Sequence, residues 1–210
     1  MRSIVTVTTP ATVERLTTVA RVQADLGITG SDTEIETAID EASSRIEAEL
    51  GYHLALETVT ETFRPVNGYE YASALLLDRT PVVSIDAITT DTVTLVEGEW
   101  TVDPINGLLL WLDGSGMGQA WHYYNALSVG YSGGWVMPGE TGRTLPPAIE
   151  SACVAYVRSI WFSRRRDPLV KSIEVPGVIS YDYWVGGTTD VGAMPPEVSA
   201  MLAPFKRLRV

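Results

Sequence analysis

Apolar residues recur at intervals of three and four in the first part of the chain, the spacing of amphipathic helices. One such stretch spans residues 10–26 and follows Thr9-Pro10, a hydroxyl cap and then a proline at the first helical position. A second spans residues 32–50, where Ser31 and Glu34 fit the S-x-x-E capping box. The carboxylates on its other side predict a solvated acidic face.

The clearest helical stripe lies near the C-terminal end, in residues 147–165. It opens at Pro146-Pro147, and its apolar positions are Ile149, Ala152, Cys153, Tyr156, Val157, Ile160 and Trp161. We expect the three helices to form one bundle, because each stripe needs a partner to bury it.

Between residues 55 and 131 the pattern changes to short runs of β-branched and aromatic residues, typical of strands. Strands are predicted near residues 58–63, 75–77, 82–85, 93–96, 100–102, 108–112 and 121–131. Asn106-Gly107 is a two-residue hairpin signal. The region therefore predicts an inserted antiparallel β unit of roughly six or seven strands.

The C-terminal part has two sections. Residues 167–194 hold prolines, glycines and apolar residues without periodicity, so they predict an extended arm. Pro195-Pro196 then opens a short final helix. The predicted fold is α+β: a helical bundle (1–54 and 145–166), an inserted β unit (55–131) and an arm with a terminal helix (167–210).

Composition narrows the class of protein. The chain has 210 residues, of which 45% are hydrophobic and 20% charged, as in globular domains. Its longest apolar runs fall far short of the roughly 20 residues of a membrane-spanning helix, and its first residues predict no signal peptide. One cysteine excludes an internal disulfide and a cysteine-based zinc site, which favours folding in a reducing cytoplasm.

Charge argues against a tight hold on DNA. The 15 basic and 26 acidic residues give a net charge of −11, which would repel phosphates over most of the surface. Residues 1–142 hold 6 basic and 20 acidic side chains, net −14, and residues 143–210 hold 9 and 6, net +3. This asymmetry indicates either a contact surface for a charged partner or a solvated surface with basic helix ends.

Candidate catalytic groups are sparse. His53 and His122 lie in different predicted elements with no third metal ligand at a telling spacing. Cys153 falls inside an apolar stripe, as a buried structural thiol does. The loop 114–118 is glycine-rich but lacks the helix and lysine of a phosphate loop. We expect no enzyme, no metal and no cofactor.

Aromatic residues keep one other class of function open. Six of them cluster in or near the β unit: Trp100, Trp111, Trp121, Tyr123, Tyr124 and Trp135. They predict either packing between strands or a platform that binds sugars, so a carbohydrate-binding β module is an alternative function.

The order of these signals resembles the gp6-like head-tail connector, or adaptor, family of long-tailed phages and gene transfer agents. Four motifs carry the resemblance, each loose alone and spread over nearly the whole chain. They are the acidic helix ending Ile46-Glu47-x-x-Leu50-Gly51, the strand Thr58–Phe63, the pair Leu77-Asp78-Arg79-Thr80-Pro81-Val82-Val83-Ser84-Ile85, and Val129-Gly130-Tyr131-Ser132-Gly133-Gly134 before the helix that starts at Pro146-Pro147. The tail Pro195-Pro196-Glu197-Val198 to Arg207 completes the order.

The resemblance implies a structural virion protein without catalysis. Such proteins form a dodecameric ring that joins the portal to the neck and tail and continues the DNA channel, through which DNA passes without tight binding. Implied partners are further copies of the chain, the portal protein and a neck stopper or tail-terminator protein, with no membrane. The implied location is the virion neck, assembled in the host cytoplasm. A stopper, or another neck or tail structural protein, is the nearest alternative.

The C-terminal residues are the predicted portal-docking segment. The arm and tail combine aromatic and apolar residues with cations, the composition of protein interfaces. The candidate docking residues are Tyr181, Tyr183, Trp184, Met201, Leu202, Phe205, Lys206, Arg207 and Arg209. The alternative is that the basic tail lies in the lumen and touches DNA.

Overall fold

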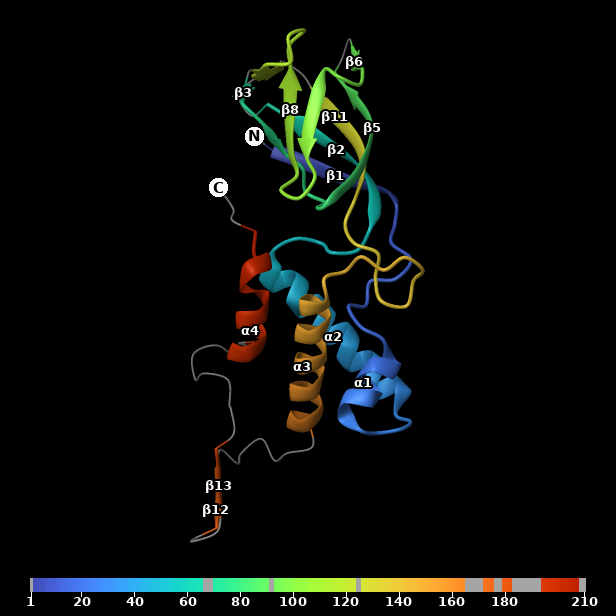
Figure 1. Ribbon diagram of the computed structural model, residues 1–210, viewed down its shortest axis with the longest axis vertical. Helices are drawn as coiled ribbons and strands as arrows, with labels where there is room; N and C mark the ends of the chain where they lie inside the picture. The colour runs from blue at the N-terminus through green and yellow to red at the C-terminus, as the bar shows by residue number, and fades with distance from the viewer. Residues whose placement is uncertain are drawn as a thin grey trace. The chain divides into compact units, whose positions relative to one another are not determined.

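The computed structural model describes residues 2–65, 70–90, 93–123, 126–164, 172–175, 179–182 and 194–207. The chain forms two compact units, each assembled from two separate stretches of sequence (Figure 1). One, the β unit, comprises Met1–Glu14 and Tyr52–Thr144, and the other, the helical unit, comprises Arg15–Gly51 and Leu145–Val210. The α+β class is confirmed.

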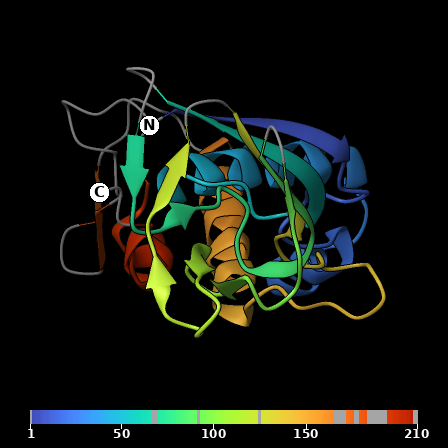
Figure 2. The same ribbon diagram turned by 90° about the horizontal axis from the view of Figure 1, so that it is seen from above.

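A five-stranded antiparallel sheet is the larger layer of the β unit. Its order is β1 (Arg2–Thr9), β2 (Glu57–Arg64), β11 (Leu127–Gly133), β5 (Val82–Thr89) and β6 (Thr94–Leu95). In Figures 1 and 2, β1, in dark blue, runs beside β2 at the margin of this sheet.

Two smaller sheets complete the unit. β8 (Leu108–Leu112) pairs with β4 (Leu75–Leu76), β7 (Trp100–Asp103) and β9 (Gly118–Gln119). β10 (Trp121–Tyr123) pairs with β3 (Glu70–Ala72). The core between these layers consists of Val59, Phe63, Leu75, Leu77, Val82, Ile88, Leu109, Trp121, Leu127, Val129 and Tyr131.

The helical unit centres on α3 (Pro147–Arg164), which contacts α1 (Val19–Leu26), α2 (Asp32–Leu50) and α4 (Pro196–Leu202). The expected bundle of three helices is confirmed. A 3-10 turn, η1 (Ala203–Phe205), follows α4 and contains Pro204. No helix in the described ranges combines the length and hydropathy needed to cross a bilayer.

The first helix is shorter than predicted and begins later. Residues 2–9 form the strand β1, and α1 starts at Val19, where the Thr18 side chain accepts a hydrogen bond from the Arg21 N–H at 3.3 Å. The Thr9-Pro10 signal was misleading because the preceding Thr/Val segment finds a sheet partner in β2. Residues 1–14, expected in the bundle, belong to the β unit.

Three smaller expectations were also wrong. Ser31 precedes α2 in a left-handed conformation (φ 59°) and its side chain makes no capping bond, so no capping box forms. The hairpin at Asn106-Gly107 has a four-residue loop, because Asp103 pairs with Leu108. The segment 121–131 divides into β10 and β11. β3 and β9 were not predicted, since two or three residues carry no period.

The C-terminal arm holds one regular element within its described residues. β12 (Ser172–Val175) and β13 (Ile179–Asp182) form an antiparallel hairpin that the sequence did not predict. The terminal helix was predicted, and α4 lies on α3 as part of the helical unit.

Candidate functional site

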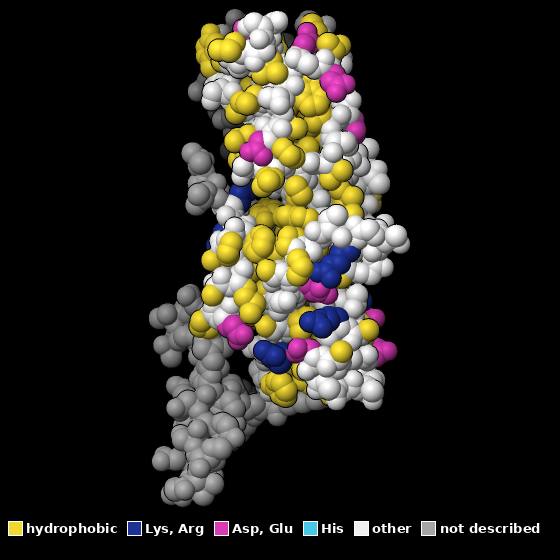
Figure 3. Space-filling view, viewed as in Figure 1, with side chains coloured by type: hydrophobic (Ala, Val, Ile, Leu, Met, Phe, Trp, Pro, Cys, Tyr) yellow, Lys and Arg dark blue, Asp and Glu magenta, His cyan; other side chains and the backbone are white. Residues whose placement is uncertain are grey.

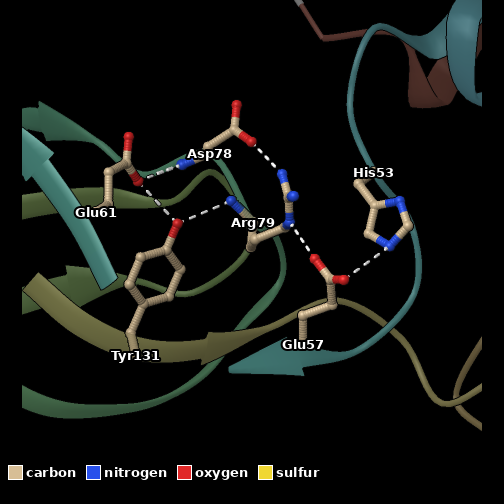
Figure 4. Close-up of polar contacts among 6 residues, drawn as sticks. All are labelled: His53, Glu57, Glu61, Asp78, Arg79 and Tyr131. Carbon is tan, nitrogen blue, oxygen red and sulfur yellow. Dashed lines mark hydrogen bonds and ion pairs between the residues drawn. The ribbon is translucent and has the colours of Figure 1, made fainter. Parts of the chain in front are cut away.

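A buried polar cluster joins three segments of the β unit (Figure 4). Glu61 in β2 accepts hydrogen bonds at Oε2 from the Tyr131 hydroxyl (2.8 Å) and the Asp78 N–H (2.9 Å). The Tyr131 oxygen in turn accepts the Arg79 N–H at 2.9 Å. Asp78 and Arg79 precede β5, so these bonds fix the entry of that strand against β2 and β11.

The cluster continues toward the surface through ion pairs. Arg79 Nε donates to Glu57 Oε2 at 2.9 Å, and its Nη1 contacts the Asp78 carboxylate. The His53 Nε2 atom lies 3.7 Å from Glu57 Oε1. The side chain of His53 is 20% exposed and belongs to this cluster. The ionisable side chains of the cluster thus become more exposed from the buried Glu61 toward His53 and Asp78.

Burial sets the protonation of the two central groups. Desolvation raises the pKa of Glu61, and hydrogen bonds from the Asp78 N–H, Ser3 and Tyr131 oppose this increase. Desolvation and the neighbouring Glu61 raise the pKa of Tyr131 far above its ordinary value. Tyr131 therefore keeps its proton and acts as a permanent donor. The role of the cluster is therefore structural: it holds β2, β11 and the segment before β5 together.

Two glycines at the end of β11 permit a close approach of backbones. A Cβ on Gly133 would lie 2.5 Å from the Arg79 carbonyl oxygen, closer than real Cβ contacts. Gly134 has φ +116° and a backbone that faces Ala55 with no room for a side chain. Both positions therefore require glycine for steric reasons.

The motifs behind the family resemblance meet at this cluster. Glu61 comes from the strand 58–63, Asp78 and Arg79 come from the Leu77–Ile85 motif, and Tyr131 and Gly133 come from the motif before Pro146. Sequence analysis did not single out Glu61. Its signal was a carboxylate at a core-facing position between Val59 and Phe63.

The predicted docking residues take different places. Leu202 is buried in the helical unit, Met201, Phe205 and Arg207 are half-buried, and Lys206 is exposed. Lys206 pairs with Glu49 of α2. Tyr181 lies in β13, where the structure describes the backbone, and Tyr183, Trp184 and Arg209 lie outside the described residues.

Acidic residues of the helical unit, most of them on α2, pair with cations of the same unit. Asp40 binds Arg15 through two hydrogen bonds of 2.6 and 3.0 Å, and Glu41 binds Arg164 at 2.9 Å. Arg158 lies 3.5 Å from Asp25 on α1. The carboxylates of this face of α2 are solvent-exposed, as the sequence predicted, and they make surface ion pairs with cations of neighbouring segments. Part of the charge asymmetry along the chain is balanced internally by Arg158, Arg164 and Lys206.

The other candidate groups have structural surroundings. Cys153 is fully buried, and desolvation raises its pKa to about 12. The loop 114–118 ends in strand β9 and turns back on β8, which is not the context of a phosphate loop. Among the residues described, no three His, Cys, Asp or Glu side chains gather in a way that could hold a metal ion. His122 lies in β10, where only the backbone is described.

The tryptophans favour packing over an open platform. Trp121 is 2% exposed and donates its indole N–H to the Leu109 carbonyl at 3.1 Å. Trp111 lies against it, with ring centroids 5.6 Å apart, and Trp100 is packed on the same core. Trp135 contacts Tyr52. The side chain of Tyr123 and residue Tyr124 lie outside the description.

Apolar side chains also reach the surface of the β unit. Leu76 and Leu108 face each other across β4 and β8, and Leu110 follows on the same face; they are 42%, 38% and 36% exposed. Ile105, at the β7–β8 loop, is 77% exposed. Figure 3 shows apolar side chains spread over the face of the β unit turned to the viewer. Such exposure is typical of surfaces that contact other proteins.

Comparison with known proteins finds the fold in gene transfer agents. No model of a known protein family matches the chain, and no curated protein matches it. A chain in a structure described as the neck of an empty GTA particle, computed with C6 symmetry, is 16% identical. Chains from the virion of a native gene transfer agent (GTA) particle and from the neck of a native GTA particle, computed with C12 symmetry, are each 14% identical. Each likeness has a TM-score of 0.59 and covers 99% of this chain and 97% of the other. The chain shares its fold with these chains, in both units.

Proposed function

We propose that the chain is a structural protein of a virion neck, an adaptor that joins the portal to the tail. The observation that carries this proposal is the full-length likeness, over both units, to chains of GTA particles whose structures are described as necks. A match over both units is more specific than a match of either unit alone. The resemblance of the sequence motifs to head-tail connectors points to the same role.

A homo-oligomeric ring is the proposed assembly, with twelve copies by resemblance. The C6 and C12 symmetries named for the neighbouring structures support a ring of this kind. The net charge of −11 suits a channel wall along which DNA slides without being held. The proposed location is the virion neck, after assembly in the host cytoplasm.

This role requires no catalysis, cofactor or metal. The buried cluster around Glu61 and Tyr131 holds segments of the β unit together, which suits a structural subunit. A stopper position in the neck is the alternative role, because it makes the same demands on the fold. The packing of Trp111 on Trp121 does not favour a carbohydrate-binding module.

Portal docking is assigned to the C-terminal segment. The buried Leu202 faces the chain's own helices, so the contact with the portal falls to Phe205, Met201 and the cations beside them. A neck stopper or tail-terminator protein would contact another face of the ring. The exposed leucines of β4 and β8 are candidates for that contact.

Electron microscopy of the purified chain, alone and mixed with a portal protein from the same source, tests the proposal. We expect rings that stack coaxially on portals. A chain that stays monomeric and ignores the portal at micromolar concentrations would contradict the adaptor role. Binding of the ring to the stopper but not to the portal would favour the alternative position.

A further inference from the structure

Strand β1 presents an open sheet edge. It is the terminal strand of the five-stranded sheet, and β2 is its only strand partner among the residues described. The pairing is regular from Arg2 to Val7, with an irregularity only between Val7 and Thr9. The strand is eight residues long, has no proline and carries one charged residue, Arg2. A long, regular edge with a single charge at its end is a template for a further strand.

The hairpin of β12 and β13 is not part of a larger sheet within the described residues. Its two strands pair with each other and with no other described strand. A two-stranded hairpin by itself is at best marginally stable in water. The register places four apolar residues on one face (Ile173, Val175, Ile179 and Tyr181) and four polar residues on the other (Ser172, Glu174, Ser180 and Asp182).

We propose that the β12–β13 hairpin of one copy adds to the β1 edge of a second copy and extends its five-stranded sheet. The core-facing side of β1, with Val5 and Val7, matches the apolar face of the hairpin, and the opposite side holds Arg2 and Thr6 together with the exposed Ile4. On β1, Val7 shares the core-facing side with Val59 of β2 and is 42% exposed, so an apolar hairpin face would cover it. Arg2 lies on the opposite side of β1, where the hairpin brings its acidic positions, Glu174 and Asp182.

The other margin of the sheet is a poorer partner for such a strand. β5 departs from regular pairing with β11 at two places, between Gly130 and Tyr131 and between Ser132 and Gly133. It is also paired at one end by β6. Bulges, a short covering strand and a charge such as Asp86 are features that protect an edge from strand addition. Between Arg2 and Val7, β1 has no bulge and no covering strand among the residues described, and its single charge stands at the end, on Arg2.

A second copy is the chosen source because every copy carries both halves of the contact: an edge strand, β1, and a hairpin, β12–β13, that pairs with no further strand among the residues described. Each copy would give its hairpin to one neighbour and accept a hairpin from another. Such a head-to-tail contact closes into a ring when the rotation fits. The inference thus rests on the proposed ring and specifies how neighbouring copies are linked.

Cross-linking between engineered cysteines tests this contact in the full-length chain. The native Cys153 is buried and will not compete. A chain with both Thr6→Cys, on the Arg2 side of β1, and Glu174→Cys, on the polar side of the hairpin, is treated with a bismaleimide of about 10 Å span, roughly two strand spacings. The matched control combines Glu174→Cys with Thr101→Cys, an exposed threonine on the edge strand β7.

We expect a ladder of covalent multiples from the Thr6→Cys and Glu174→Cys chain, in at least about tenfold greater yield than from the control. Rings in micrographs without that ladder, or with links only inside single chains, would overturn the strand addition while the proposed ring stands. Absence of both rings and intermolecular links would overturn the ring and this contact together. Mixing the two single variants must give covalent dimers, whereas either alone must not.

Discussion

Tyr131 donates its hydroxyl proton to Glu61 at 2.8 Å across 70 positions of sequence, and the same oxygen accepts the Arg79 N–H at 2.9 Å. One side chain thereby joins β11 to β2 and to the segment that leads into β5. Both partners are backbone or carboxylate groups that would be costly to leave unsatisfied in the core.

Replacing Tyr131 with phenylalanine should destabilise the chain without changing its fold. The ring volume is kept, but Glu61 loses a donor and the Arg79 N–H loses its acceptor, which costs about 1–3 kcal/mol. Urea unfolding followed by tryptophan fluorescence measures the change. Tyr71→Phe is the control, because Tyr71 is 66% exposed and its substitution should change stability by less than about 0.5 kcal/mol. Equal effects at the two positions would contradict the role given to Tyr131.

Stability should fall as pH rises above the ordinary pKa of Glu61. Because burial raises the pKa of Glu61 in the folded chain above its reference value of 4.5, the folded state keeps a proton that the unfolded state has lost between the two values. The contribution of this group is therefore complete below pH 4.5 and is lost as the pH approaches the folded pKa, at a slope of at most about 1.4 kcal/mol per pH unit.

Glu61→Gln isolates that dependence. The amide cannot ionise, so the difference in unfolding free energy between the native chain and the variant should shift in favour of the variant as the pH is raised from below the reference value of 4.5 to about pH 7. Chemical denaturation at several pH values gives both curves. Parallel curves would mean that Glu61 has the same pKa in the folded and unfolded chains.

Gly133→Ala should be much more harmful than Gly130→Ala, although both glycines lie in β11. The new Cβ at Gly133 would meet the Arg79 carbonyl oxygen at 2.5 Å, and this backbone atom cannot move aside without disturbing the polar cluster. The expected cost is about 1–3 kcal/mol or more. At Gly130 the nearest atom is 3.8 Å away, an ordinary contact. Thermal unfolding of the two variants, purified in parallel, makes the comparison.

Substitutions of the buried Leu202 and of the half-buried Phe205 in the C-terminal segment should have different effects. Leu202→Ala removes a fully buried side chain and should lower the stability of the helical unit by about 2–5 kcal/mol. Phe205→Ala should keep the fold and weaken joining to the portal by about 1–3 kcal/mol, more than Arg209→Ala does, because buried aromatic area usually outweighs a rim charge.

Cosedimentation with portals and circular dichroism distinguish these effects. Normal joining by a folded Phe205→Ala chain would show that this residue is not part of the docking surface. If Arg209→Ala weakened joining more than Phe205→Ala, charge and not apolar area would dominate the contact.

Cys153 should not react with a thiol reagent while the chain is folded. Desolvation raises its pKa to about 12, so almost no thiolate exists at pH 8, and the sulfur is buried between α2 and α3. Absorbance after addition of an aromatic disulfide reagent measures the reaction. Labelling should begin only in denaturant, and rapid labelling of the native chain would contradict the burial.

The sequence predicted elements best where a long period repeats. The bounds of α2 and of α3 were close because their helical patterns are unbroken, whereas residues 2–9 were missed because a strand at the N-terminus depends on a distant partner, β2. The polar cluster was not predicted for the same reason. Its members come from distant strands, so only the misplaced carboxylate Glu61 could have indicated it.

The chain leaves each unit and returns to it, passing between them after residues 14, 51 and 144. During synthesis β1 emerges before its pairing strand β2, and the sheet can be completed only after β11 has been made, because β11 lies between β2 and β5. Helices α1 and α2 likewise lack their packing partner α3 until it is made, as the next element after β11. Both cores are therefore completed late and close together in time. Products truncated before β11 would complete neither unit, so an assembling particle would meet few chains of that kind with one folded unit that could compete for its sites.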